Sequence, residues 1–350
     1  MKILHLHTIL NLTCGISKTI YLIAKYPVGK GEHFVLAIDG DAGKKFSDSN
    51  INFSFLNLNR NSITGVFRII KFLKKYIKEN SIDIVHSHHR FFDFISYILS
   101  YICKIKRVTS VQSFVYGKKL ISYKSPVLLA AGESVKKHLI NYYNIKEERI
   151  ILFNNYVDIN EIPDNVNADM IKAELNIPVN SYLIGYVGRF SIKEKGIDIL
   201  LNAFKTFNEK HPDSYLIMVG DGEDIKKISI PQNVIIVSKK VNIFDYYKSF
   251  DCLILPSRVD PFPLTVLEAG MMKIPFIGAD VNGISEIIEN KIDGLLFKKG
   301  NENMLFEKME LYYVKRDYAN KCAKNLYQKV LDKYNHIEAI ELLNSIYNKL

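Results

Sequence analysis

Three features that would define a function directly are scarce or missing in this chain. The four cysteines are scattered without a C-x-x-C pair, which argues against a disulfide framework and against a zinc site: Cys14, Cys103, Cys252 and Cys322. No run reaches the about 18 uninterrupted apolar residues that a membrane-spanning helix needs. The short apolar segment MKILHLHTIL predicts a first strand rather than a signal peptide. We therefore expect a protein on the cytoplasmic side of the membrane.

Composition and charge are more informative than these absences. The 350 residues are 48% hydrophobic and 24% charged, which suits a soluble globular chain with two domains rather than one core. The net charge of +10 comes entirely from residues 1–165, with 23 Lys and Arg against 13 Asp and Glu, because the remainder has 24 of each. A basic first half suggests an anionic partner there.

Short apolar runs alternate with helical patterns in two series, which predicts β-α-β units around parallel sheets. A stretch rich in Asp, Asn and Pro between about residues 158 and 180 separates the series. We expect an α/β fold with two Rossmann-like, doubly wound parallel-sheet domains over 1–163 and 164–330, facing across a cleft. A C-terminal helix over 331–350 is expected to pack back toward the first domain.

One helix pattern, VFRIIKFLKKYIK from Val66, separates apolar from basic side chains. Its cations lie largely opposite the apolar face: Arg68, Lys71, Lys74, Lys75 and Lys78. This pattern fits a solvated outer helix. It also fits a helix that lies against anionic lipid headgroups.

The segment YVGRFSIKEKGIDILL places Gly188 and Arg189 after a strand, and Lys195 and Gly196 before a helix. Two cations and glycine-freed amides at such a turn can receive a phosphate or diphosphate, although a lysine-rich surface loop is an equally good explanation of this segment alone. A second glycine turn begins at Gly220.

The segment SRVDPFPLTVLEAG raises the question of which partner a carboxylate meets in an apolar helix. Phe262 and Pro263 precede the helix, and the amides of Leu264 and Thr265 in its first turn favour an anion. Glu268 lies about one turn further along, where its carboxylate can accept two hydrogen bonds from a ribose diol. Asp260 stands eight residues before it. Phosphate and ribose together indicate a nucleotide.

These spaced motifs resemble group 1 (family 4) retaining glycosyltransferases of the GT-B fold. The family's G-R-x(5)-K-G, G-D-G and P-S-x(2)-E-x(7)-E-A elements are matched in order, with Asp260 where the first Glu is usual. The segment IPFIGADVNGISEII is similar to a further family segment, with Lys273 replacing its first glycine.

The first half resembles the family through four shorter elements. Gly15 matches the glycine that members place near the donor diphosphate, and DIVHSHH aligns His88 with a family histidine. NNYVD places Asn155 at the N-G-V-D element, and Gln112 stands where many members carry a histidine near the transferred sugar. Asp39-Gly40-Asp41 imitates the D-x-D of metal-dependent glycosyltransferases, but a turn is expected there.

No metal and no cofactor are expected. We expect His86, His88 and His89 to lie on alternating faces of a strand end without nearby carboxylate or thiolate ligands, and we do not expect them to bind metal.

The resemblance implies transfer of a sugar from a nucleoside diphosphate sugar to a glycan or lipid-linked acceptor, with retention, in cell-surface polysaccharide synthesis. It implies catalytic roles for Arg189, Lys195 and Asp260. Donor contacts are implied for Gly15, Gly188, Gly220, Phe262, Pro263, Leu264, Thr265 and Glu268. Donor-sugar or acceptor contacts are implied for His88, Gln112 and Asn155. An anionic membrane surface is the expected partner of the basic first domain, and nucleic acid is not. A nucleotide-sugar epimerase and a noncatalytic nucleotide-sugar-binding protein of the same fold are the alternatives.

Overall fold

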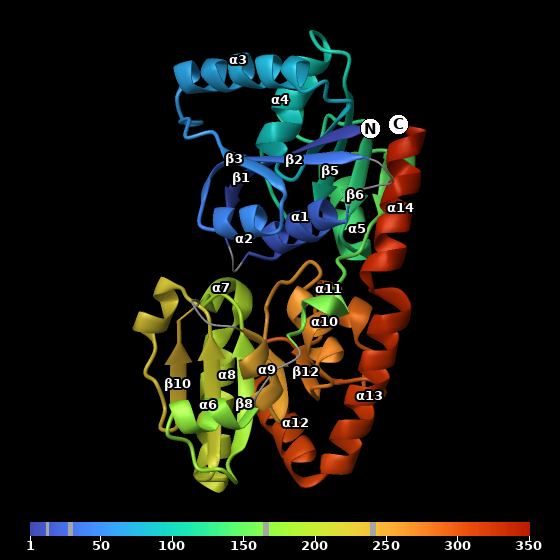
Figure 1. Cartoon of the computed structure of the whole chain (residues 1–350). Helices are drawn as coiled ribbons and strands as arrows, with labels where there is room; N and C mark the ends of the chain where they lie inside the picture. The colour runs from blue at the N-terminus through green and yellow to red at the C-terminus, as the bar shows by residue number, and fades with distance from the viewer. Residues whose placement is uncertain (12–13, 27–30, 164–167, 239–242) are drawn as a thin grey trace. The chain divides into compact units, whose positions relative to one another are not determined.

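The computed structural model describes the chain except for residues 12–13, 27–30, 164–167 and 239–242 (Figure 1). Its contacts divide the chain into two compact units, Met1–Asn155 with His336–Leu350, and Tyr156–Asn335. The sequence-based boundary between 163 and 164 falls at the edge of residues outside the described ranges.

The first unit is built on a seven-stranded parallel sheet in the order β3-β2-β1-β4-β5-β6-β7. The strands are β1 (Lys2–Leu10), β2 (Glu32–Gly40), β3 (Asn52–Phe55), β4 (Ile84–Ser87), β5 (Lys106–Val111), β6 (Val127–Ala130) and β7 (Ile150–Leu152). Strand β1 pairs along most of its length with β2, from Lys2 opposite Glu32 to Leu10 opposite Gly40. Central strands of such a sheet are covered on both faces, which is why β1 and β4 carry few exposed side chains.

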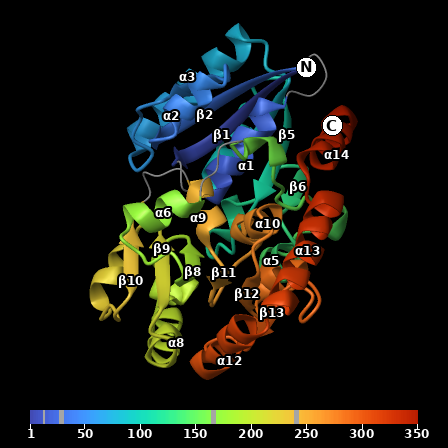
Figure 2. The ribbon, with the colours of Figure 1, turned by 60° about the horizontal axis from the view of Figure 1, so that its bottom comes forward.

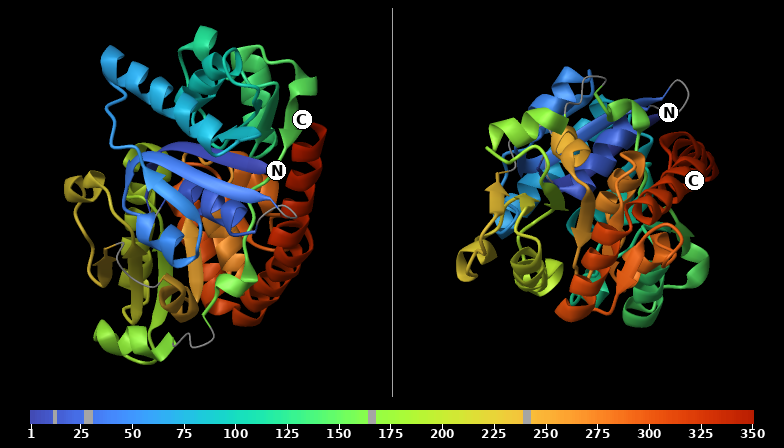
Figure 3. Two further views of the ribbon diagram at one scale, coloured as in Figure 1. Left: turned by 45° about the horizontal axis from the view of Figure 1, so that its top comes forward. Right: turned by 90° about the horizontal axis from the view of Figure 1, so that it is seen from below.

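Helices complete the first unit, and all but the last of them connect its strands. They are α1 (Gly15–Lys25), α2 (Gly43–Asp48), α3 (Ile63–Glu79), α4 (Arg90–Ser100), α5 (Glu133–Tyr143) and α14 (His336–Lys349), with short 3₁₀ turns η1 (Lys119–Ile121) and η2 (Glu147–Arg149). Helix α3 begins where Ser62 accepts a hydrogen bond from the Gly65 amide, and it buries Ile69, Leu73 and Ile77. These side chains join residues of β1, β2, β4 and α4 in one core, so α3 and α4 cover the same face of the sheet (Figure 3). The amphipathic helix expected there is confirmed.

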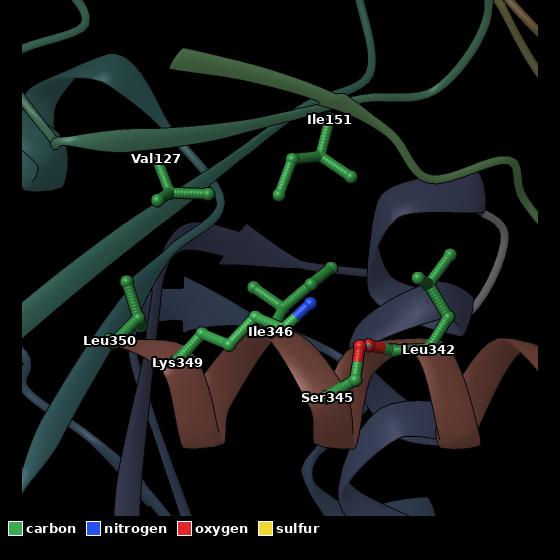
Figure 4. Close-up of a pocket in the computed structure, with 7 residues that line it drawn as sticks. All are labelled: Val127, Ile151, Leu342, Ser345, Ile346, Lys349 and Leu350. Atoms are coloured by element: carbon green, nitrogen blue, oxygen red, sulfur yellow. Dashed lines mark hydrogen bonds between the residues drawn. The ribbon is translucent and has the colours of Figure 1, made fainter. Parts of the chain in front are cut away.

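Helix α14 belongs to the first unit although it ends the chain. The Tyr347 hydroxyl lies 2.6 Å from Nδ1 of His86 on β4. A cavity of about 210 Å³ lies beside this helix, lined by Val127, Ile151, Leu342, Ser345, Ile346, Lys349 and Leu350 (Figure 4). Its lining is mostly apolar, which does not suit a charged nucleotide.

The second unit carries a six-stranded parallel sheet in the order β10-β9-β8-β11-β12-β13. Its strands are β8 (Tyr182–Val187), β9 (Ser214–Val219), β10 (Val234–Val237), β11 (Cys252–Leu255), β12 (Phe276–Ala279) and β13 (Leu295–Phe297). Its helices are α6 (Ala168–Glu174), α7 (Ile192–Lys195), α8 (Ile197–Lys210), α9 (Ile243–Ser249), α10 (Leu264–Met271), α11 (Asn282–Ile287), α12 (Glu302–Val314) and α13 (Arg316–Lys333), with 3₁₀ turns η3 (Ile159–Glu161) and η4 (Glu223–Lys227). The α/β class with two parallel sheets is confirmed. No helix among the described residues is long and apolar enough to cross a membrane.

Both sheets reverse their strand order at one point. In the first unit, β1 is flanked by β2 and β4. In the second unit, β8 is flanked by β9 and β11 (Figure 2). Loops that leave neighbouring strands in opposite directions open a crevice at their carboxyl ends, where open α/β sheets bind ligands. The candidate residues of the second unit follow these strands, as do Gly15 and His88 of the first unit.

Candidate active site

The second unit concentrates its candidate residues in the loops that follow β8 and β11. The first loop runs from Gly188 to Lys195 at the end of α7, and the second runs from Pro256 to Pro263, which is the N-cap of α10. Because β8 and β11 are paired neighbours, the two loops leave the sheet side by side. The motif residues therefore meet at the topological switch point of this sheet.

Glycine is required where these loops touch. A Cβ on Gly196, whose φ is 63°, would lie 2.3 Å from the carbonyl oxygen of Pro256. A Cβ on Gly220, after β9, would lie 2.0 Å from the carbonyl oxygen of Gly188. Such distances are far shorter than van der Waals contact, so the backbones can only approach this closely without side chains. The loops after β8, β9 and β11 thus pack directly against one another.

Two of these loops carry a charged pair, Lys195 and Asp260. The Lys195 ammonium lies 2.5 Å from Oδ2 of Asp260, and the two side chains are 21% and 5% exposed. The Ser257 hydroxyl donates to the same carboxylate oxygen at 3.2 Å. Asp260 is further held through its backbone, because its carbonyl oxygen accepts from the Gly283 amide at 3.0 Å. Lys195 and Asp260 therefore meet although 65 residues separate them.

Arg189 is also paired with an acid. Its guanidinium contacts the Glu194 carboxylate, and these side chains are 61% and 51% exposed. The backbone carbonyl of Arg189 accepts from the Tyr186 hydroxyl at 2.7 Å, which fixes the loop directly after β8. The Arg189 side chain is thus open to solvent and to a ligand, with a partner that an anion can replace.

Helix α10 carries Glu268, and the structure shows a partner for its carboxylate. The buried Glu268 carboxylate accepts a hydrogen bond from the buried Tyr247 hydroxyl of α9. Burial raises the pKa of Tyr247 far above its ordinary value, and the Glu268 charge raises it further, so the phenol remains a donor. The Thr265 hydroxyl reaches the Val187 carbonyl at 3.5 Å, which sets the first turn of α10 against the end of β8. Phe262 and Leu264 are buried beside this turn.

The candidate residues of the first unit form a separate polar group. The Asn155 side-chain oxygen accepts from Nε2 of Gln112 at 3.1 Å and from the Thr19 hydroxyl at 3.3 Å. Thr19 lies one turn after Gly15, the first residue of α1, and its hydroxyl also donates to the Gly15 carbonyl. Gln112 follows β5, so β5, α1 and the segment after β7 supply this group.

His88 lies in a network of buried histidines. His5 on β1 lies 3.1 Å from His88 through Nδ1 and 2.9 Å from His33 through Nε2. Burial lowers the pKa of His5, His86 and His88 well below the ordinary value, and the neighbouring imidazoles lower it further. These rings are therefore neutral at pH 7.

The expectation that His86 and His88 lie on alternating faces is wrong. Their rings stack with centroids 4.1 Å apart, because residues two apart in an extended segment point the same way. Nitrogen atoms of His5, His86 and His88 lie within 4.8 Å of one another, the spacing of a metal site. His86, however, already uses Nε2 toward Ser110 and Nδ1 toward Tyr347, at 2.7 and 2.6 Å. A metal would have to break these hydrogen bonds.

Sequence reasoning missed four residues that shape the site in the second unit. Glu194 pairs with Arg189, Tyr247 with Glu268, and Arg258 with Asp198. Glu194, Arg258 and Asp198 lie within or next to the recognised motifs, so their charge was a usable signal. Tyr247 lies in α9, and nothing in its local sequence marks it.

Two family models match the chain. The model of the glycosyl transferases group 1 matches residues 167–329, and the model of glycosyltransferase family 4 matches residues 13–161. The Escherichia coli UDP-Gal:alpha-D-GlcNAc-diphosphoundecaprenol alpha-1,3-galactosyltransferase is 25% identical over 306 residues, which cover 79% of this chain and 77% of that protein. The Staphylococcus aureus capsular polysaccharide biosynthesis glycosyltransferase CapM is 23% identical over 261 residues, covering 69% and 68%.

Solved structures match over nearly the whole chain. A glycosyltransferase from Rickettsia africae superimposes with a TM-score of 0.87 at 22% identity, covering 99% of this chain and 98% of that one. The Anabaena protein HepE, solved in complex with UDP-glucose, also gives a TM-score of 0.87, at 17% identity and full coverage of both chains. At such identities the likeness shows the fold. It confirms the GT-B class that the motifs led us to expect.

Proposed function

The chain belongs to the group 1 glycosyltransferases, and on this premise we propose that it transfers a sugar from a nucleoside diphosphate sugar to an acceptor hydroxyl, with retained anomeric configuration and without a metal ion. The acceptor is a glycan or a lipid-linked sugar in cell-surface polysaccharide synthesis. One observation carries the proposal: Arg189, Lys195 and the first turn of α10 gather at the switch point of the second sheet.

The cations stabilise the departing diphosphate. Negative charge develops on the phosphate as its bond to the sugar breaks, and preorganised cations and helix-terminus amides oppose that charge without a metal. Lys195 supplies a half-buried ammonium, and Arg189 supplies a guanidinium that can bind two phosphate oxygens at once. The acceptor hydroxyl forms the new bond to the sugar, and its proton passes to an oxygen of the leaving phosphate.

Glu268 and Asp260 bind the two ends of the donor. Glu268, whose carboxylate the Tyr247 hydroxyl orients, accepts hydrogen bonds from the ribose diol. Asp260 accepts from a sugar hydroxyl, and the diphosphate shares Lys195 with it. Gly188 and Gly220 let the backbone approach the phosphates closely.

In the first unit, His88 and Gln112 offer atoms to a sugar. Among the described residues, no hydrogen-bond partner reaches Nδ1 of His88 or Oε1 of Gln112, and both atoms are buried. Leaving buried polar atoms unpaired is costly. Hydroxyl groups of the donor sugar or the acceptor would satisfy them, with Asn155 holding Gln112 in place and Gly15 near the diphosphate.

The relatives suggest the classes of donor and acceptor. HepE is solved with UDP-glucose, and the E. coli relative is named for a UDP-sugar donor and a diphosphoundecaprenol acceptor. We therefore take a UDP-sugar as the first donor to test and a sugar on an isoprenoid diphosphate as the first acceptor.

A lipid-linked acceptor places the enzyme at the inner face of the cytoplasmic membrane. The outer side of α3 fits such a surface, because Ile63 and Phe67 are 79% and 68% exposed and, by helical periodicity, share one side of the helix with Lys71, Lys74 and Lys78. Cations that surround exposed apolar side chains are typical of helices that lie in a lipid headgroup region.

The decisive experiment separates binding from turnover. Calorimetry with UDP, GDP, dTDP and ADP identifies the nucleotide, and matching sugar nucleotides are then incubated with and without lipid-linked acceptors. We expect free nucleoside diphosphate to appear only with acceptor, at the same rate with or without EDTA. Interconversion of the donor sugar would favour an epimerase, and binding without turnover would favour a noncatalytic protein. Binding of none of the nucleotides would overturn the proposal.

A further inference from the structure

Arg258 connects the two loops of the site in the second unit. It lies two residues before Asp260 in the loop after β11. Its guanidinium bonds Asp198 in the first turn of α8 with two parallel hydrogen bonds, NH1 to Oδ1 at 2.6 Å and NH2 to Oδ2 at 2.7 Å. A bidentate pair fixes orientation as well as distance.

The same residue holds α7, the single turn that ends at Lys195. NH1 of Arg258 also donates to the Ile192 carbonyl at 2.5 Å. The backbone amides of Arg258 and Val259 donate to the Glu194 carbonyl at 2.7 and 3.1 Å. The residue directly before Lys195 is therefore anchored by the backbone of the loop that carries Asp260.

Helix α7 needs this support. It spans four residues, Ile192–Lys195, and one isolated helical turn is unstable because nucleation costs more than its hydrogen bonds return. Gly196 then turns the chain with a φ of 63° into α8. Without contacts from outside α7, the backbone of Lys195 would not be held in a fixed position relative to a ligand.

Arg258 itself is not available as a phosphate cation. Its charge is satisfied by Asp198, and hydrogen bonding to Asp198 raises the pKa of Arg258. Its guanidinium is engaged by the Asp198 carboxylate and the Ile192 carbonyl. Its contacts hold α7 and the start of α8 against the loop after β11.

We propose that Arg258, oriented by Asp198, is a positioning residue that sets the location of Lys195 relative to Asp260 and to the donor diphosphate. The inference rests on the proposed function, since Lys195 must bind the diphosphate for its position to matter. Arg258 acts through Lys195 and touches no substrate.

The test is a double-mutant cycle on nucleotide affinity. UDP affinity is measured by calorimetry for Arg258→Gln, Arg258→Lys, Asp198→Asn, Lys195→Ala and the double variant Lys195→Ala with Arg258→Gln. We expect each Arg258 and Asp198 variant to bind UDP about tenfold more weakly, because neither a lysine nor an amide restores two charge-assisted bonds. We expect the double variant to bind no more weakly than Lys195→Ala alone.

Arg316→Gln is the matched control. Arg316 pairs with Asp251 in the same unit, with 44% and 38% exposure against 28% and 30% for Arg258 and Asp198, but it lies outside the two loops. We expect it to leave UDP affinity unchanged. Asp198→Asn keeps the side-chain shape, so it remains informative if the Arg258 variants do not fold.

The possible failures are distinguishable. If wild type binds UDP and Lys195→Ala weakens binding while Arg258→Gln does not, the inference alone is wrong. If the two losses multiply in the double variant, Arg258 acts independently of Lys195 and the inference is again wrong. If wild type binds none of UDP, GDP, dTDP and ADP, the proposed function fails and takes this inference with it.

Discussion

The ammonium of Lys195 and the carboxylate of Asp260 lie 2.5 Å apart, and both belong to motifs that the family resemblance places at the donor. The buried acid holds the cation in place. Each of the two charges lowers the free-energy cost of burying the other. In the proposed reaction, the donor diphosphate binds beside this ion pair.

We expect Lys195→Ala to lower turnover at least a hundredfold while the fold survives. Removing one preorganised donor to developing charge typically costs about 3 to 4 kcal/mol of transition-state stabilisation. Steady-state kinetics with the identified donor measures the loss, and circular dichroism checks the fold. Asp260→Asn is a useful companion, because it tests the acid while leaving the lysine. Near-normal turnover of Lys195→Ala would refute its catalytic assignment.

We expect Glu268→Gln to weaken UDP binding about tenfold or more, because hydrogen bonds to a charged group contribute about 1.5 to 3 kcal/mol. Calorimetry measures this affinity. The control is 2′,3′-dideoxy-UDP, which lacks the diol and should bind wild type and variant equally. Unchanged affinity for UDP would show that Glu268 does not bind the ribose.

We expect Glu194→Gln to strengthen UDP binding about twofold to fivefold. Glu194 pairs with Arg189 in an exposed position, where such ion pairs contribute little and are easily exchanged for another anion. The matched control is Glu223→Gln, which breaks the exposed pair of Glu223 with Lys226 in the same unit and should change nothing. Weaker binding by Glu194→Gln would mean that Glu194 orients Arg189 rather than competing for it.

The sequence was sufficient for the local parts of this structure. Alternating apolar runs predicted both parallel sheets, and the segment around Val66 predicted α3, because these depend on periodicity along the chain. Contacts across long separations were not predictable. The pairs Arg258 with Asp198 and Tyr247 with Glu268 depend on which strands become neighbours and on the register of their loops. The local sequence pattern encodes neither the strand neighbours nor the register. The prediction that His86 and His88 lie on alternating faces was also wrong, at the point where the strand ends.

We expect the chain to bind vesicles of phosphatidylglycerol and phosphatidylcholine in a salt-sensitive way and to ignore purely neutral vesicles. By helical periodicity, Lys71, Lys74 and Lys78 lie on the same side of α3 as Phe67, and each lysine near an anionic surface contributes about 1 kcal/mol. Replacing the three by alanine should therefore weaken binding about a hundredfold in a flotation assay. The control is the triple alanine variant of Lys205, Lys298 and Lys299 in the second unit. Equal binding to neutral vesicles, or equal losses in both variants, would contradict docking through α3.

The buried histidines of the first unit predict acid sensitivity. Burial lowers the pKa of His7 to about 3 and of His33 to about 4, and that of His5, His86 and His88 well below 6.5. Below about pH 6.5 the histidines bind protons in the unfolded chain but stay neutral in the folded chain. The free energy of unfolding is therefore highest above pH 6.5 and falls as the pH drops toward 4. Each such group costs about 1.4 kcal/mol per pH unit, and several together approach the whole stability of a domain. Urea unfolding followed by far-ultraviolet circular dichroism should show a first transition that moves steeply to lower urea between pH 7 and pH 5. His33→Asn should reduce the pH slope of the unfolding free energy by about the contribution of one proton. A urea midpoint that stays constant between pH 7 and pH 5 would show that these rings do not remain neutral in the folded chain.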